Sequence, residues 1–357
     1  MKNKVTHLLL VFLLLNSFNV FSQYLHHYVG KINNKYPITL NLFFTKNIIS
    51  GTMYYNNVGI YIDISGSVSG NKVKMKGTTP KGKLSDIFEG KIVENNIVGK
   101  WINPKNSKTY NFSVSEVDTE CVAVKSYNFE RKDSIKVGKE YATFSYENNG
   151  YYPVATPHKG YEKVLLKKIF EVPDTLDFLQ FLKLYVDTLH DDWKEFGVEE
   201  ADSDESVFTM SYDYSTETDI AYDKNCIFSL SFTHSEYTGG AHGFAFSAFY
   251  NFDVAKNKEL LYSDVFSVDS SVFVNKFILP KLEHDVYENC GDSLQNMLLS
   301  DSVGFPDYWL IMEGGIDFIY NVYSILPYAC GDYEVFISYD RLKGYLKHDF
   351  LKRIGKL

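Results

Sequence analysis

The first third of the chain alternates apolar and polar residues in short segments. In residues 38–44, for example, Ile38, Leu40 and Leu42 share one face of an extended strand, and Thr39 and Asn41 share the other. Asparagine, glycine and proline lie between the segments, where they favour tight turns. Closely spaced strands joined in this way predict an all-β antiparallel meander that closes or half-closes into a barrel. Strands are predicted at residues 28–32, 38–44, 51–55, 60–64, 72–76, 88–93, 97–102 and 109–114.

After residue 174 the apolar residues follow a helical period. Leu179 and Leu182 lie on one face of a helix predicted over residues 175–197, with Asp174 or Thr175 as its N-cap. Strands resume on both sides of this helix, so the second region is predicted to be α+β, an antiparallel sheet with two packed helices. The other predicted elements are helices at 271–289 and 340–351, a turn at 148–153, and strands at 121–127, 142–146, 208–214, 226–232, 244–252, 308–312, 316–320 and 334–338.

These patterns divide the chain into a leader and two regions. Residues 1–22 are predicted to be a signal peptide, because Lys2 and Lys4 precede an apolar run too short to span a bilayer. Residues 23–116 form the barrel-like domain and residues 118–357 the α+β domain. No later apolar run is long enough for a membrane span, so we expect a secreted or periplasmic protein.

The charge balance limits the classes of partner. The chain has 36 basic and 45 acidic residues, and removal of the leader takes two lysines, which leaves 34 − 45 = −11. An acidic chain has no basic face for nucleic acid. A basic protein partner fits this charge, although solubility alone also explains it.

Four cysteines allow three disulfide pairings, and the sequence does not choose among them. Cys226 lies on the apolar face of a predicted strand, which favours a buried thiol. Cys290 and Cys330 each precede a glycine in a turn-like setting, so these two are favoured if any pair forms. For Cys121 the sequence indicates no preferred partner. No Cys-x-x-Cys pattern supports structural zinc.

Three motifs of the second region resemble those of a family of paired extracellular domains of unknown function. They are Tyr-Thr-Gly-Gly-Ala-His at 237–242, Phe-Asp at 252–253 and Pro-Tyr-Ala-Cys-Gly at 327–331. Such domains occur in the lysozyme-sensing anti-sigma factor RsiV and beside the catalytic domain of the peptidoglycan deacetylase PdaC. The resemblance covers about residues 120–347. It implies an extracellular fold and contact with lysozyme, but it names no reaction, because the catalytic centre of PdaC lies in a separate domain.

Two histidine clusters invite a catalytic or metal interpretation. His242, with His234 and Glu236, could meet a zinc ion, or its ring could clamp the glycine turn by hydrogen bonds. His190-Asp191-Asp192 could bind a metal, although a solvated helix end explains it better. No nucleophile elbow and no phosphate-binding glycine pattern occurs, and acidic residues are too many to nominate a catalytic pair.

We therefore expect a non-catalytic binding protein of the cell envelope that recognises lysozyme or peptidoglycan fragments, without cofactor or metal. The candidate binding residues are Tyr151, Tyr152, Tyr237 and His242, with the acidic run 199–205 as a long-range attractor. Two alternatives stay open: a cell-wall hydrolase with an unrecognised carboxylate site, and a carrier of a small apolar ligand in the barrel. The oligomeric state is not determined by the sequence.

Overall fold

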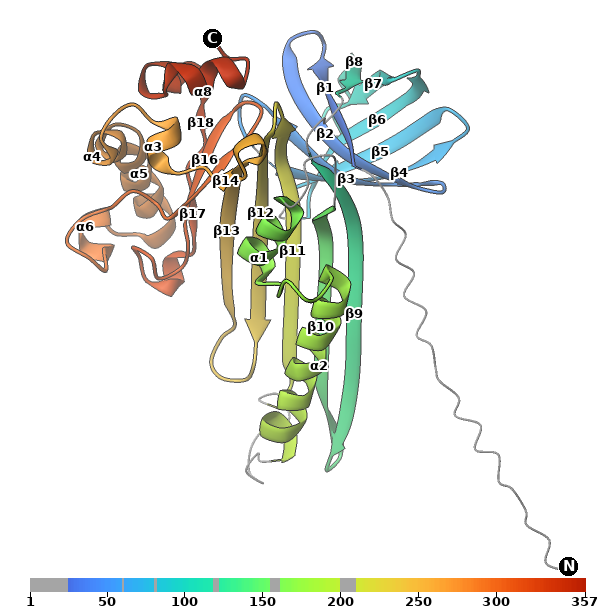
Figure 1. Ribbon diagram of the computed structural model, residues 1–357, viewed down its shortest axis with the longest axis vertical. Coiled ribbons are helices and arrows are strands. Elements are labelled where there is room, and N and C mark those ends of the chain that lie inside the picture. Colours follow the sequence, from blue (N-terminus) through green and yellow to red (C-terminus); the bar gives the residue numbers. More distant parts are fainter. Residues whose placement is uncertain (1–24, 60, 80–81, 118–121, 155–160, 200–209) are drawn as a thin grey trace, which may run out of the picture.

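The computed structural model describes residues 25–59, 61–79, 82–117, 122–154, 161–199 and 210–357. In Figure 1 the barrel sits at one end of a long central sheet, and the C-terminal elements lie beside one long edge of that sheet. The predicted leader, Cys121 and most of the acidic run 199–205 lie outside the described residues. Within the described ranges, no helix has the length and apolar character needed to cross a membrane.

The N-terminal region is a closed antiparallel barrel of eight strands, as its alternating pattern predicts. Each strand pairs with the next, and β8 pairs with β1. The inward residues form a filled apolar core that includes Leu40, Met53 and Phe88. Gly90 and Gly99 face each other on β6 and β7, where a side chain on Gly99 would collide with the neighbouring strand. The strands are β1 His26–Ile32, β2 Tyr36–Thr45, β3 Ile48–Tyr55, β4 Tyr61–Ser69, β5 Lys72–Thr78, β6 Leu84–Val93, β7 Asn96–Ile102 and β8 Thr109–Glu116.

The central sheet has six strands in the order β14-β13-β12-β11-β10-β9. The prediction of an antiparallel sheet is wrong at one place, because β10 and β11 are parallel. Two helices connect these strands, and such a crossover returns the chain to the same end of the sheet. The strands are β9 Ala123–Val137, β10 Glu140–Val154, β11 Tyr212–Lys224, β12 Ile227–Tyr237, β13 Phe244–Asp253 and β14 Lys258–Glu259.

Strands β9 and β10 form one long hairpin, and here the sequence prediction was wrong. Residues 148–153 were predicted to form a turn, but they continue β10. The asparagines and the glycine suggested a turn, whereas Gly150 has a different function. Its φ is 137°, and a Cβ there would lie 2.2 Å from Thr218 Oγ1. Glycine therefore lets β10 pass close to β11 without breaking the strand.

Two helices cover one face of the central sheet, α1 Tyr161–Phe170 and α2 Phe178–Asp192, and α2 continues as a π-helical turn over Trp193–Glu199 (Figure 1). The helix α1 was not predicted. Helix α2 begins later than predicted, because Asp177 accepts a hydrogen bond from the Gln180 amide in a capping box. Its apolar face packs on aromatic residues of β9, β10 and β11.

The C-terminal region combines a four-stranded sheet with short helices. Strand β15 lies against β11, β12 and β13 of the central sheet. The predicted helix 271–289 is present, with a π-helical segment Val274–Ile278 in its middle. The strands are β15 Tyr308–Ile311, β16 Gly315–Tyr320, β17 Tyr333–Glu334 and β18 Ile337–Ser338; the helices are α3 Tyr262–Val265, α4 Ser270–Phe273, α5 Leu279–Cys290, α6 Leu294–Met297, α7 Tyr339–Leu342 and α8 His348–Arg353, with 3-10 turns at Val254–Lys256, Tyr328–Cys330 and Lys343–Tyr345.

The barrel contacts the rest of the molecule through both polar and apolar side chains. Asn41 of β2 donates a hydrogen bond to the Ile220 carbonyl of β11. Tyr54 of β3 packs in a cluster with Phe249 and Leu310, two buried residues of the other sheets. The division at residues 116–118 remains a prediction, since the barrel has its own core yet also shares this cluster.

Candidate functional site

The two most specific sequence motifs meet in space. Residues 238–243 connect β12 to β13, and Gly239 and Gly240 have φ values of 87° and 93°, as the paired glycines predict. The Tyr328 hydroxyl, from the Pro-Tyr-Ala-Cys-Gly turn, donates to the Gly243 carbonyl at 2.9 Å. The His242 ring stacks on the Tyr328 ring, with centroids 4.1 Å apart. The two motifs therefore hold each other in place through this hydrogen bond and this ring contact.

This contact favours the structural interpretation of His242. Its Nδ1 lies 2.9 Å from the Gly243 carbonyl oxygen, and Tyr237 donates to the Gly240 carbonyl at 3.0 Å. His234 Nε2 is 3.2 Å from Glu236 Oε2. Among the described residues no group of three histidine, cysteine, aspartate or glutamate side chains could hold a metal ion. His242 is exposed and Tyr237 is half-buried, and their candidacy for binding stays a prediction.

A disulfide between Cys290 and Cys330 fixes the same turn to the end of α5, with the Cα atoms 5.5 Å apart. This is the pair that the two turn-like settings favour. The expectation of a buried thiol at Cys226 is wrong, because Cys226 is disulfide-bonded and only half-buried. A period-two pattern places a cysteine on a strand face but does not reveal its partner.

The adjacent candidates Tyr151 and Tyr152 point to opposite faces of β10, as strand geometry requires. Tyr152 is buried in the core, where its ring stacks on Phe178 of α2 with centroids 4.6 Å apart. Its ring contributes to the packing of β10 against α2, and its candidacy for binding stays a prediction. Tyr151 faces the barrel and stacks on Phe43 of β2, at 4.3 Å with the ring planes 6° apart. The backbone of Tyr151 is held by Thr218, because the Tyr151 amide donates to Thr218 Oγ1 at 2.7 Å.

Tyr151 lines a cleft of about 430 Å³ between the barrel and the central sheet. Strands β3 and β4 form one wall, and β9, β10 and β11 form the other. On the sheet face opposite α2, alternate residues of β10 and β11 are polar and exposed. Its lining is mostly polar: Thr45, Ser50, Gly51, Thr52, Asp63, Ile64, Ser126, Tyr127, Asn128, Asn149, Gly150, Tyr151, Glu217, Thr218 and Asp219.

Three of these residues are carboxylates, and none of the described lining residues is basic. Asp219 is buried, and burial raises its pKa to about 7 even though Tyr54 and Thr52 donate to it at 2.5 and 3.3 Å. Glu217 is accessible, but the walls of the cleft reduce its hydration and raise its pKa, and the neighbouring Asp63 carboxylate adds to this shift.

Sequence reasoning missed all three carboxylates. Glu217 and Asp219 are two residues apart on β11 and therefore share a strand face, which is the only local signal. Asp63 comes from a different region of the chain, so the cluster forms only when the barrel contacts the sheet. Among 45 acidic residues, such a pair cannot be selected without the tertiary structure.

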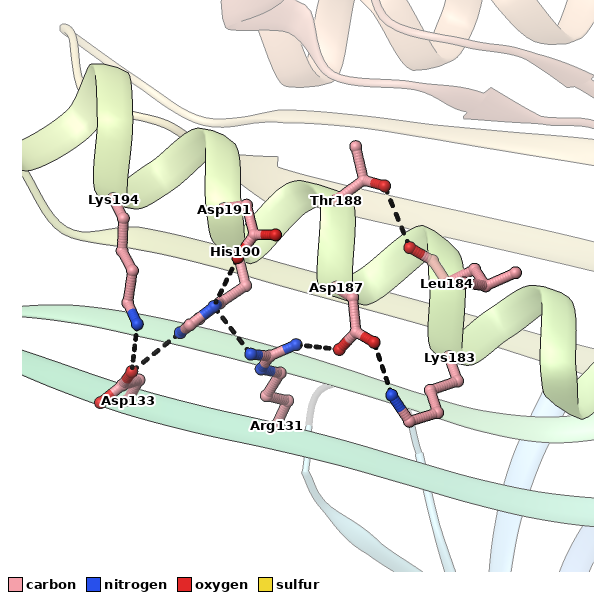
Figure 2. Close-up of polar contacts among 9 residues, drawn as sticks. All are labelled: Arg131, Asp133, Lys183, Leu184, Asp187, Thr188, His190, Asp191 and Lys194. Carbon is pink, nitrogen blue, oxygen red and sulfur yellow. Dashed lines mark hydrogen bonds and ion pairs between the residues drawn. The ribbon is translucent and has the colours of Figure 1, made fainter.

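The histidine at the end of α2 is not solvated, and the described residues around it include no set of three side chains that could hold a metal ion. His190 is buried, and Figure 2 shows it between Arg131 and Asp133 of β9. Arg131 Nη2 donates to Nδ1 at 2.7 Å, because arginine has no acceptor. The proton therefore lies on Nε2, which donates to Asp133 at 2.8 Å. The expectation of a solvated helix end is therefore wrong for His190, which attaches α2 to the long hairpin, although Asp191 and Asp192 are exposed as expected.

Comparisons with known proteins show which domain families and which fold this chain resembles. The family described as Deacetylase PdaC matches residues 105–245, and the family of unknown function DUF3298 matches residues 263–340. A DUF3298 family member from Bacteroides fragilis NCTC 9343 superposes with a TM-score of 0.53 at 20% identity, over 66% of this chain and 98% of its own. A DUF3298 family protein from Pseudomonas aeruginosa PAO1 gives a TM-score of 0.44 at 15% identity, over 63% of this chain and 95% of its own. No curated protein matches the sequence.

Proposed function

The chain carries a PdaC/DUF3298-like domain of unknown function, as its motifs indicated, and from this premise we propose an exported, non-catalytic binding protein of the cell envelope. Its ligand is a basic protein, and lysozyme is the first candidate. A lysine or arginine side chain of that partner enters the cleft between the barrel and the central sheet.

The observation that carries this proposal is the composition of the cleft. Asp63, Glu217 and Asp219 line one hollow whose other described lining residues are neutral. Carboxylates without a basic neighbour attract a cation, and a guanidinium or ammonium group can donate to the accessible pair Asp63 and Glu217. The ring of Tyr151, which Phe43 holds in place, offers the flat aromatic contact that binding sites favour.

Direct binding tests the proposal. The mature chain is titrated against immobilised lysozyme at about 50 mM and about 300 mM NaCl, because salt screens attraction between exposed charges. The double variant Asp63→Asn/Glu217→Gln should bind about tenfold more weakly or worse at low salt. Soluble peptidoglycan fragments are titrated in parallel.

A control variant with the same change in net charge distinguishes the contribution of the cleft residues to affinity from the effect of net charge. Asp340 and Asp349 have side chains that are 94% and 104% exposed, on the C-terminal helices away from the cleft. The variant Asp340→Asn/Asp349→Asn should leave affinity nearly unchanged. Equal losses in both variants would show that net charge alone attracts the partner. Absence of binding to lysozyme and to the fragments well above micromolar concentration would end the proposal.

The raised pKa values favour one second candidate, a cell-wall hydrolase. Glycosidases use two carboxyl groups in one cleft whose pKa values are shifted by their surroundings, and Glu217 and Asp219 both have raised pKa values. Against it, both oxygens of Asp219 already accept hydrogen bonds from barrel side chains. The test is release of reducing ends from soluble peptidoglycan, with Glu217→Gln as the matched variant. Release that disappears in this variant would support the hydrolase and not the binding protein.

A further inference from the structure

The open end of the barrel holds a second cavity, separate from the polar cleft. The carrier alternative placed a ligand in the barrel interior, but that interior is filled by apolar side chains. A cavity of about 350 Å³ lies instead at the mouth, where strands β1 to β7 begin or end. The core residues Ile32 and Ile62 line it, together with Tyr36, Tyr55 and Trp101. This volume is near the lower limit for sites that bind small molecules.

The apolar and aromatic lining of this cavity also contains one carboxylate, Asp86. Its side chain faces inward and the residue is 1% exposed. Oδ1 accepts from the Tyr55 hydroxyl and from Trp101 Nε1, the latter at 2.6 Å, whereas the buried Oδ2 has no partner among the described residues. Within the described residues, no basic side chain forms an ion pair with Asp86. A carboxylate offers about four acceptor sites, so about half of this one is unused.

We propose that the barrel mouth binds a small molecule with a protonated primary amine on an apolar body. A buried carboxylate without a counter-ion is costly, and an ammonium group supplies both the opposite charge and the missing donors. The rings of Tyr36, Tyr55 and Trp101 contact the apolar body, and their faces attract the cation. Trp101 is held for this contact by stacking on Tyr110, with centroids 5.9 Å apart.

The probe is 2-phenylethylamine, and 2-phenylethanol is the neutral control with the same apolar body. Calorimetric titration of the mature chain should show that the amine binds about tenfold more tightly than the alcohol, the ratio expected for one charge-assisted hydrogen bond. The indole N–H resonance of Trp101, assigned with Trp101→Phe, should shift on binding, because this N–H donates to Asp86.

The variant Asp86→Asn should remove the preference for the amine. Glu89→Gln is the matched control, since Glu89 lies on the same strand with its side chain 52% exposed, and it should bind as the wild type does. If Asp86→Asn disrupts the barrel, Tyr36→Ala still tests the site, because Tyr36 is a rim residue and 45% exposed. Equal affinity for amine and alcohol, equal losses in Asp86→Asn and Glu89→Gln, or an unshifted Trp101 resonance would each overturn the proposal.

Discussion

Asp219 accepts hydrogen bonds from Tyr54 and Thr52 across the boundary between the barrel and the central sheet. Tyr54 is itself buried among apolar residues, and the neighbouring carboxylate adds to burial in raising its pKa well above the ordinary value. One carboxylate thus belongs both to the wall of the cleft and to the contact that forms the cleft. A residue in this position couples protonation to the stability of the boundary.

The pKa of Asp219 predicts how stability depends on pH. Its ordinary value of 3.8 rises to about 7 in the folded protein. The folded state therefore holds a proton that the unfolded state releases, and this contribution to stability decreases as pH rises from about 4 to about 7. Asp219→Asn, which carries no charge, should lack this decrease. Relative to the wild type, the variant should gain up to a few kcal/mol between pH 5 and pH 8.

Urea unfolding of both proteins at the two pH values measures this difference. Other buried carboxyls such as Asp223 and Asp317 also have raised pKa values, so only the difference between the variant and the wild type is interpreted. Parallel pH profiles for the two proteins would contradict the assignment.

Among the elements, the β12–β13 connection depends most clearly on backbone conformation. Gly240 has a φ of 93°, a conformation that residues with a Cβ rarely adopt, although no atom would obstruct that Cβ. Gly240→Ala should therefore destabilise the protein by about 1 kcal/mol through backbone strain alone. Gly344→Ala is the matched control, because its surroundings are equally open and its φ is ordinary. Chemical unfolding should show the loss only in Gly240→Ala, and equal effects would contradict the argument.

Helix α2 is held on the β9–β10 hairpin by the contacts shown in Figure 2. His190→Ala leaves Arg131 and Asp133 without their shared partner and opens a cavity beside Phe144, whose ring lies 5.2 Å from the imidazole. We expect a loss of about 2–3 kcal/mol in unfolding free energy. Asp191→Ala, one residue further and 79% exposed, should change it by about 0.5 kcal/mol at most. Destabilisation of the wild type by a chelator would instead indicate a metal at His190.

The barrel is attached to the rest of the molecule by several buried contacts. It has a core of its own, yet Asn41, Tyr54 and Phe43 make buried contacts with the central sheet. We predict that limited proteolysis cuts near residues 115–120 and that the two fragments remain associated. Co-elution from a size-exclusion column after cleavage, followed by separation in mild denaturant, is the expected result. Fragments that elute apart in native buffer would show that these contacts contribute little to the association of the two parts.

Local patterns in the sequence were sufficient to predict several elements of the fold. Period-two alternation with turn residues predicted the barrel strands, and a helical period predicted α2 and the helix around residues 271–289. Paired glycines predicted the positive φ values between β12 and β13. The motifs at 237–242 and 327–331 predicted the domain type, and the turn-like settings of Cys290 and Cys330 favoured their disulfide.

Other features depend on residues that are far apart in the chain and that meet only in the tertiary structure. It made β10 parallel to β11, continued β10 through Gly150, buried Tyr152, and placed His190 between Arg131 and Asp133. It also formed both candidate sites, the cleft of Asp63, Glu217 and Asp219 and the mouth around Asp86. The physical reason is common to all of them. A local pattern determines which face of an element is apolar, whereas the free energy of burying a charge or an aromatic ring depends on what the rest of the chain places against that face.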